Sequence, residues 1–180
     1  MKVAILSPFS PADVADCMDV ARNGPDSLPS GTGGTNIVSL VKARLSHGLP
    51  TDVITLDPTQ SADIRRWEGR LLRLWIVRQR PNRALRDGFL SERRLLHKAL
   101  HESDAKVCHA HWTYEYGAAA VTQRLMPHVV SVHDHAGHVL RWADFRYLGL
   151  YIITRKVLSR ARSLTAVSPY VAEYVSGIVR

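Results

Sequence analysis

The sequence predicts an α/β protein with a doubly wound, mostly parallel, Rossmann-like sheet that carries helices on both faces. Short apolar runs alternate with amphipathic stretches along the whole chain, which is the pattern of strands joined by helices. With 180 residues, of which 46% are hydrophobic, the chain can bury the core of one such domain. Right-handed crossovers between parallel strands leave few other topologies.

Six segments are predicted to be strands, because they are short, largely apolar runs bounded by turn residues or prolines, and the first of them is predicted to be buried. They are residues 2–7, 52–56, 71–77, 107–111, 129–133 and 163–167. The segment 71–77 also contains arginines, so its sequence does not decide which face is buried.

Helices are predicted between these strands. Their ranges are 35–47, 90–103, 116–125, 147–161 and 169–179. The first is bounded by Gly48 and Pro50, and the last has Pro169 in its first turn, where proline is well tolerated. Residues 8–30 are rich in Pro, Asp and Ser and predict a long loop with a short helical turn near 14–21. Loops of this length within a domain are usually functional or mobile.

A glycine-rich loop, Ser30-Gly31-Thr32-Gly33-Gly34-Thr35, leads directly into the first predicted helix. Glycine allows close backbone approach, and a helix N-terminus offers free N–H groups and a partial positive charge. Together they suit an anion such as phosphate. An ordinary flexible loop that ends in a glycine N-cap is the alternative. The loop is neither the dinucleotide fingerprint, which directly follows the first strand, nor a P-loop, which needs a Lys-Ser/Thr pair.

Polar and aromatic residues follow several of the predicted strands, at the edge where doubly wound sheets bind ligands. They are Ser7, Pro8, His111, Trp112, His133, Asp134 and Ser168. His133, with Asp134 beside it, is suited to orient or polarise a sugar hydroxyl. A structural histidine that caps the next helix is the alternative for His133. His109 alternates with Cys108 and Ala110 in a strand and is interpreted as a core residue.

Five histidines raise the question of a metal site, since imidazole is the commonest metal ligand. They are His109, His111, His133, His135 and His138. His133, His135 and His138 are close enough in sequence to share an ion, but no Cys, His or Glu set has the spacing of a zinc site. We therefore expect neither a metal nor another cofactor.

The formal net charge of +8 is concentrated in residues 65–98, which hold eleven Lys/Arg against three Asp/Glu. This segment suits anionic lipid headgroups or an anionic substrate, and a merely solvated basic surface is the alternative. No nucleic-acid partner is expected, because no nucleic-acid-binding motif accompanies the charge. The two cysteines, Cys17 and Cys108, form no disulfide framework. Together with the lack of a signal peptide or a membrane-spanning run, this predicts a cytoplasmic protein, with membrane association through the basic segment as an option.

Five segments together resemble the N-terminal domain of retaining glycosyltransferases of family 4, which have the GT-B fold. They are residues 2–7, Gly33-Gly34, 107–112, 130–134 and 164–168. The resemblance implies a nucleotide-sugar donor and a glycan, lipid-linked or small-molecule acceptor, without a metal in catalysis. It also implies that Gly33, Gly34 and Thr35 bind the donor diphosphate and that His133 and Asp134 are catalytic. His111, Trp112 and Ser168 become acceptor-side candidates.

The resemblance implies that residues 1–180 form the acceptor-side domain of a two-domain enzyme. The nucleotide-sugar domain is absent from this chain, so we expect the chain alone to be inactive. Two alternatives stay open. One is another GT-B enzyme, such as a nucleotide-sugar 2-epimerase, and the other is a non-catalytic module whose basic face binds membrane or nucleic acid.

Overall fold

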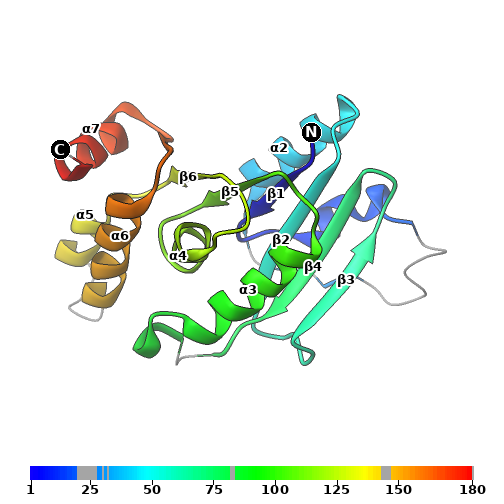
Figure 1. Cartoon of the computed structure of the whole chain (residues 1–180), viewed down its shortest axis with the longest axis horizontal. Coiled ribbons are helices and arrows are strands. Elements are labelled where there is room, and N and C mark those ends of the chain that lie inside the picture. The colour runs from blue at the N-terminus through cyan, green and yellow to red at the C-terminus, as the bar shows by residue number, and fades with distance from the viewer. Residues whose placement is uncertain (20–27, 30, 32, 82–83, 143–146, 180) are drawn as a thin grey trace.

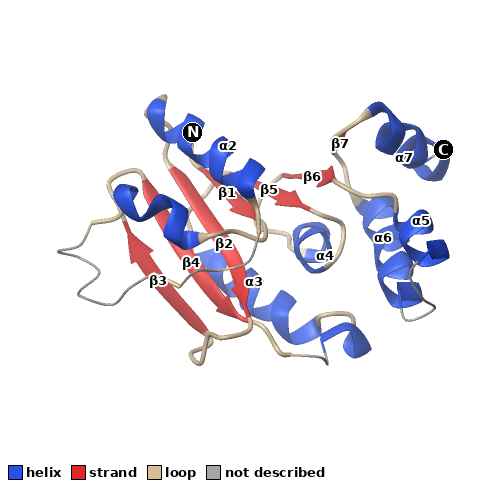
Figure 2. Cartoon of the chain, turned by 180° about the vertical axis from the view of Figure 1, so that it is seen from behind, coloured by secondary structure: helices blue, strands red, loops and turns tan. Residues whose placement is uncertain are grey.

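Seven strands form one sheet in the order β3-β4-β2-β1-β5-β6-β7 (Figures 1 and 2). The computed structural model describes residues 1–19, 28–29, 31, 33–81, 84–142 and 147–179. The strands are β1 (Val3–Leu6), β2 (Thr51–Asp57), β3 (Ile64–Glu68), β4 (Leu72–Arg78), β5 (Val107–His111), β6 (His128–Val132) and β7 (Leu164–Ala166). All neighbouring strands are parallel except β3 and β4.

Helices connect these strands. They are α2 (Thr35–Ser46), α3 (Leu90–Glu102), α4 (Glu115–Thr122), α5 (Ala136–Trp142), α6 (Leu148–Arg160) and α7 (Pro169–Val179), with the 3₁₀ helices η1 (Pro11–Cys17) and η2 (Ala84–Asp87). In the described part of the chain, none of the helices has the length and apolarity needed to cross a bilayer.

The strand order confirms the predicted doubly wound fold. Without β3, the order β4-β2-β1-β5-β6-β7 is the strand order of the Rossmann fold. The chain adds β2 and β4 on one side of β1, and then β5, β6 and β7 on the other side. The winding direction therefore reverses between β1 and β5, and a doubly wound sheet binds its ligand at this reversal.

Alternation along the strands divides the core between the two faces of the sheet. Ile5 packs with Ile37 and Val41 on the face that α2 covers. Leu6 packs with Leu96 and Tyr116 on the opposite face, under α3 and α4. Figures 1 and 2, which view the molecule from opposite sides, show α2 and α3 on opposite faces of the strands. The predicted covering of both faces is confirmed.

The arginines of β4 do not prevent its burial on both faces. Leu74 and Ile76 face α2, and Trp75 faces α3. Arg73 reaches the amino edge of the sheet, where its guanidinium binds both carboxylate oxygens of buried Asp52 at 2.8 and 2.6 Å. A bidentate pair of this kind is among the stronger polar contacts in proteins.

The strand β3 was not predicted, because Arg65 and Arg66 interrupt its apolar character. It pairs with β4 as an antiparallel edge strand. The guanidinium carbons of Arg65 and Arg66 lie 4.8 and 5.3 Å from the ring centroids of Trp67 and Trp75. Cation–π contacts thus replace the apolar alternation that usually marks a strand.

Two further predictions differ from the structure. The loop over 8–30 contains the 3₁₀ helix η1 rather than a turn at 14–21, and 20–27 and 30 lie outside the described residues. The helix predicted over 116–125 ends at Thr122. The amide oxygen of Gln123 accepts hydrogen bonds from the N–H groups of Leu125 and Met126, so a side chain rather than the helix satisfies them.

Tyr116 joins α4 to the sheet by a buried hydrogen bond, in which the N–H of Leu56 donates to Tyr116 Oη at 3.0 Å. We expect Tyr116→Phe to lower the free energy of unfolding by about 1–3 kcal/mol, because a buried backbone N–H loses its acceptor. Urea unfolding measures this change. Tyr147→Phe, at an exposed position, is the matched control. Equal stability of the two variants would contradict the assigned bond.

Candidate functional site

The glycine loop lies against the chain that leaves β1. Gly31, Gly33 and Gly34 all have left-handed backbone angles, with φ of 65°, 73° and 91°. A Cβ on Gly34 would lie 2.4 Å from the Pro8 carbonyl oxygen, and one on Gly31 would lie 2.3 Å from that of Phe9. A Cβ on Gly33 would meet nothing within 4 Å. Gly31 and Gly34 therefore allow close packing, whereas Gly33 faces open space.

Gly34 is the N-cap of α2, and its carbonyl accepts hydrogen bonds from the N–H groups of Ile37 and Val38 at 2.8 Å each. The N–H groups before these have no partner inside the helix. The first turn of α2, including Thr35, therefore presents donors and the positive end of the helix dipole at the carboxyl edge of the sheet. The helix geometry that the predicted phosphate-binding loop needs is therefore present at the start of α2. Ser30 and Thr32 of the loop lie outside the described residues.

His111 and His133 meet across the ends of β5 and β6. His111 Nδ1 and His133 Nε2 are 3.0 Å apart and share a hydrogen bond. The indole of Trp112 stacks on the ring of His133, with centroids 4.0 Å apart and planes 13° apart. The structure thus brings three of the predicted site residues into one cluster, which we call the histidine cluster.

Trp112 also links this cluster to the glycine loop, because it packs against the apolar cluster that contains Phe9 and Ile37. Its φ is 67°, a strained value for a bulky residue. The carbonyl of Trp112 lies close to α4, where a Cβ on Gly117 would be 2.7 Å from it. Strained backbone of this kind persists where the surroundings hold it and is frequent at functional sites.

Asp134 is held by a residue that the sequence did not single out. Tyr114 Oη donates a hydrogen bond to Asp134 Oδ2 at 2.6 Å. Asp134 Oδ1 and His111 Nε2 are buried and have no hydrogen-bond partner within the described residues. Buried polar atoms are normally paired, so these two atoms have hydrogen-bonding capacity that the described residues leave unused.

Burial keeps the imidazoles neutral. Burial, helped by the nearby charges of His109 and His133, lowers the pKa of His111 to about 3. Burial also lowers the pKa of His133, although the Asp134 carboxylate opposes this shift. Neutral imidazoles both donate and accept hydrogen bonds. The cluster is therefore suited to orient hydroxyl groups through hydrogen bonds, rather than to act as a cation.

His109 is not a core residue, contrary to the prediction. Its neighbours Cys108 and Ala110 face the apolar core, but its own half-buried ring lies on the other face of β5. There His109 Nε2 and Ser131 Oγ are 2.7 Å apart, and Ser131 Oγ lies 2.6 Å from Thr165 Oγ1. A polar network thus runs across β5, β6 and β7. The spacing of His109 and His111, and of Ser131 and His133, is the period-2 signal that predicts a shared face.

His135, not His133, caps the helix that follows β6. His135 Nδ1 accepts a hydrogen bond from the N–H of His138 at 3.1 Å, and its ring stacks on those of His138 and Tyr174. Ser168 caps α7, since its Oγ accepts from the N–H of Val171 at 3.3 Å. Among the residues that the structure describes, no group of three or more His, Cys, Asp or Glu side chains is placed to hold a metal ion.

Comparisons with known proteins place the chain in a wider group. The family model described as "Glycosyl transferase 4-like domain" matches residues 31–179. No curated protein sequence matches the chain. Among solved structures, a sucrose-phosphate synthase from Thermosynechococcus elongatus is similar over 99% of this chain and 45% of its own, with 16% identity and a TM-score of 0.64.

A second similar structure is described as "Trehalose-6-phosphate from E. coli bound with UDP-2-fluoro glucose". It is similar over 98% of this chain and 42% of its own, with 9% identity and a TM-score of 0.59. The chain thus spans less than half the length of either structure. At these identities the two structures support the fold.

The two loop glycines are expected to respond differently to a methyl group. Gly34→Ala should lower the free energy of unfolding by about 1–3 kcal/mol, because it combines a positive φ with a clash at the Pro8 carbonyl. Gly33→Ala should lower the free energy of unfolding by only about 1 kcal/mol, the cost of a left-handed backbone at an alanine, because its methyl group clashes with nothing. Urea unfolding of both variants tests this order. A larger loss for Gly33→Ala would contradict the packing described.

The buried imidazole of His111 predicts a pH dependence of stability. Its folded-state pKa of about 3 lies below the ordinary value, so its contribution is complete above about pH 6.5. That contribution is lost progressively as the pH falls toward 3, because only the unfolded state takes up the proton. Because burial also lowers the pKa of His109 and His133, the unmodified protein and His111→Asn both lose stability between pH 7 and 5, and we expect the unmodified protein to lose about 1–2 kcal/mol more. Identical pH profiles in urea unfolding would rule this out.

Proposed function

Because the chain belongs to the family of glycosyl transferase 4-like domains, we propose that residues 1–180 form the acceptor-side N-terminal domain of a GT-B glycosyltransferase. The enzyme would transfer a sugar from a nucleotide-sugar donor to a glycan, lipid-linked or small-molecule acceptor, with retention of configuration. The observation that carries this proposal is the histidine cluster beside a glycine-capped helix N-terminus, at the point where the winding of the sheet reverses.

In this proposal the donor diphosphate binds at Gly33, Gly34 and the N–H of Thr35. The left-handed φ of Gly33 and the open space around its Cα support close approach of a diphosphate to the backbone. The amides at the start of α2 would stabilise the negative charge that builds up as the diphosphate leaves. No metal or other cofactor is required in this scheme, as the family resemblance implies.

His133 would contact the reacting sugar. Its Nε2 is engaged by His111, which fixes the ring and directs Nδ1 to a hydroxyl of the donor or acceptor. Asp134, anchored through Oδ2 by Tyr114, would use Oδ1 to accept a hydrogen bond from a second hydroxyl. The two residues would thus hold the sugar in one orientation while the bond from its anomeric carbon to the diphosphate breaks and the acceptor oxygen bonds to that carbon. The acceptor hydroxyl would give its proton to the departing nucleoside diphosphate. His111, Trp112 and Ser168 are proposed to line the acceptor side.

A second domain would supply most of the contacts to the nucleotide sugar. The structures that resemble this chain are more than twice as long, and one of them is bound with UDP-2-fluoro glucose. We therefore propose that residues 1–180 alone do not transfer sugar. Binding and orientation across two domains supply a large part of the catalysis in such an enzyme.

The basic segment 65–98 carries the alternative proposal of a binding module on an anionic membrane. Several of its cations are committed to carboxylates, which reduces the charge available to lipid. Arg66 pairs with Glu68, Arg78 with Asp63, Arg73 with Asp52, and Arg80 with Asp87 and Glu92. We propose that the protein is cytoplasmic, contacts a membrane peripherally through the basic residues of this segment, and has no nucleic-acid partner.

The two functions differ in which residues they require. In the whole protein we expect His133→Ala to lower kcat for sugar transfer by at least about a hundredfold, because a group that orients the reacting sugar is lost. His101→Ala, an exposed histidine on α3, is the control. Turnover is measured as the release of nucleoside diphosphate from each of a panel of UDP-, GDP- and ADP-hexoses.

Charge reversal provides the opposite test. Replacing Arg65, Arg66, Arg93 and Arg94 by Glu should leave most of the turnover on a soluble acceptor if the protein is a transferase. If this replacement abolishes function while the His133→Ala protein works normally, the binding module is the better account.

A further inference from the structure

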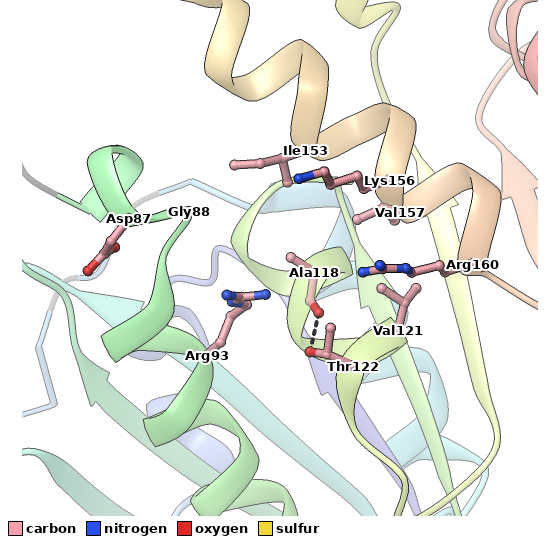
Figure 3. Close-up of a pocket in the computed structure, with 10 residues that line it drawn as sticks. All are labelled: Asp87, Gly88, Arg93, Ala118, Val121, Thr122, Ile153, Lys156, Val157 and Arg160. Atoms are coloured by element: carbon pink, nitrogen blue, oxygen red, sulfur yellow. Dashed lines mark hydrogen bonds between the residues drawn. The ribbon is translucent and has the colours of Figure 1, made fainter.

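A cavity of about 290 Å³ lies between α3, α4 and α6. It is on the sheet face opposite α2, whereas Trp112 of the histidine cluster packs on the α2 face. Its volume is at the lower end of the range for small-molecule sites. Three cations line it, Arg93 from α3 with Lys156 and Arg160 from α6. Figure 3 shows Arg93 and Arg160 extending over α4 from opposite sides.

Among the residues that the structure describes, the three cations lack the carboxylate partners that several other basic residues have. Within the described residues, none of the ion pairs involves Arg93, Lys156 or Arg160. Asp87, at the rim, is held by both terminal nitrogens of Arg80 at 2.9 Å. The hydrogen bonds from Arg80 also lower the pKa of Asp87, so this carboxylate stays ionised on Arg80.

Arg93 carries a donor that the fold leaves unused. Its Nε is buried and has no hydrogen-bond partner in the described part of the chain. A buried guanidinium N–H without an acceptor is costly, and most native structures avoid it. The like charges around the cavity add mutual repulsion. An anion in the cavity would accept from Arg93 and relieve the repulsion among all three cations.

Three apolar side chains, Val121, Ile153 and Val157, also line the cavity, and together we call them its apolar wall. On α6, Ile153 and Val157 alternate with Lys156 and Arg160, so the cavity offers cationic and hydrocarbon groups within one small volume. A free carboxylate or chloride would use only part of this surface. A phosphate monoester, with two negative charges and several acceptor oxygens on a carbon chain, matches both sides.

We propose that this cavity is a binding site for a phosphate monoester, separate from the crevice where sugar transfer is proposed. Arg93 holds the phosphate by a forked hydrogen bond, Lys156 and Arg160 close over it, and the apolar wall contacts the carbon chain. The phosphate belongs either to a soluble metabolite or to a lipid headgroup at a membrane surface. Both sources share the chemistry that the cavity recognises.

Binding to the whole protein tests the proposal. Calorimetry with inorganic phosphate and with glycerol 3-phosphate probes the soluble source, and sedimentation with vesicles of phosphatidylcholine containing phosphatidic acid probes the lipid source. We expect the variant combining Arg93→Met and Lys156→Met to bind at least about tenfold more weakly to the probe that the unmodified protein binds. The matched control is Arg155→Met, which removes an exposed charge from the same helix beside Lys156.

Each outcome decides the proposal. Binding of soluble phosphate that depends on Arg93 and Lys156 supports a metabolite site. Binding of phosphatidic acid vesicles alone, with the same dependence, supports a headgroup site. No binding of either probe, or equal weakening by Arg155→Met, overturns the proposal.

Circular dichroism shows whether the variants fold, and Arg93→Lys, which keeps the charge but loses the fork, should bind with intermediate affinity. His133→Ala should leave this binding unchanged, so the two sites are tested independently.

Discussion

The reversal of winding between β1 and β5 is the constraint on which the structure depends. Chain segments leaving neighbouring parallel strands usually return over one face of the sheet, but at a reversal they part to opposite faces. The segment after β1 turns toward α2, and the segment after β5 turns toward α4. The glycine loop and Trp112 lie on the two sides of the opening. Gly34 allows α2 to begin against the Pro8 carbonyl, and Gly117 allows α4 to lie close under Trp112.

The polar residues at this opening work by position more than by charge. His111 and His133 are joined by a hydrogen bond and held neutral by burial, and the ring of His133 is fixed from the other side by Trp112. Tyr114 in turn holds Asp134. A rigid set of donors and acceptors at a helix N-terminus is suited to bind a molecule with both hydroxyl groups and a diphosphate, which is the chemistry of a nucleotide sugar.

The sheet and the position of the site could be predicted from the sequence because both follow from local patterns. Strands are recognised in the sequence as short, largely apolar runs. The residues that follow parallel strands must lie together at the carboxyl edge of the sheet. Other features depend on partners distant in sequence. Arg66 of β3 lies over Trp75 of β4, a contact that exists only when the two strands pair, and Tyr114 reaches Asp134 only once β5 and β6 are paired.

Capping by His135 and the basic cavity were missed for the same reason. His135 and His133 are equally plausible caps in the sequence, and only the start of α5 at Ala136 distinguishes them. In the sequence, the basic residues of 65–98 indicate one charged surface, but the fold places them in different surroundings. Arg73 and Arg80 form ion pairs with carboxylates, whereas Arg93 lines a cavity together with Lys156 and Arg160 of α6.

Hydrogen exchange of the backbone amides in the whole protein, with and without its nucleotide-sugar donor, tests the central claim most directly. The measurement reports on each segment of the opening without altering any residue. The account predicts that the donor slows exchange at residues 33–36, 111–114 and 133–135, while the amino edge of the sheet is unaffected. Protection confined to other segments, with no change at the start of α2 or around Trp112, would contradict it.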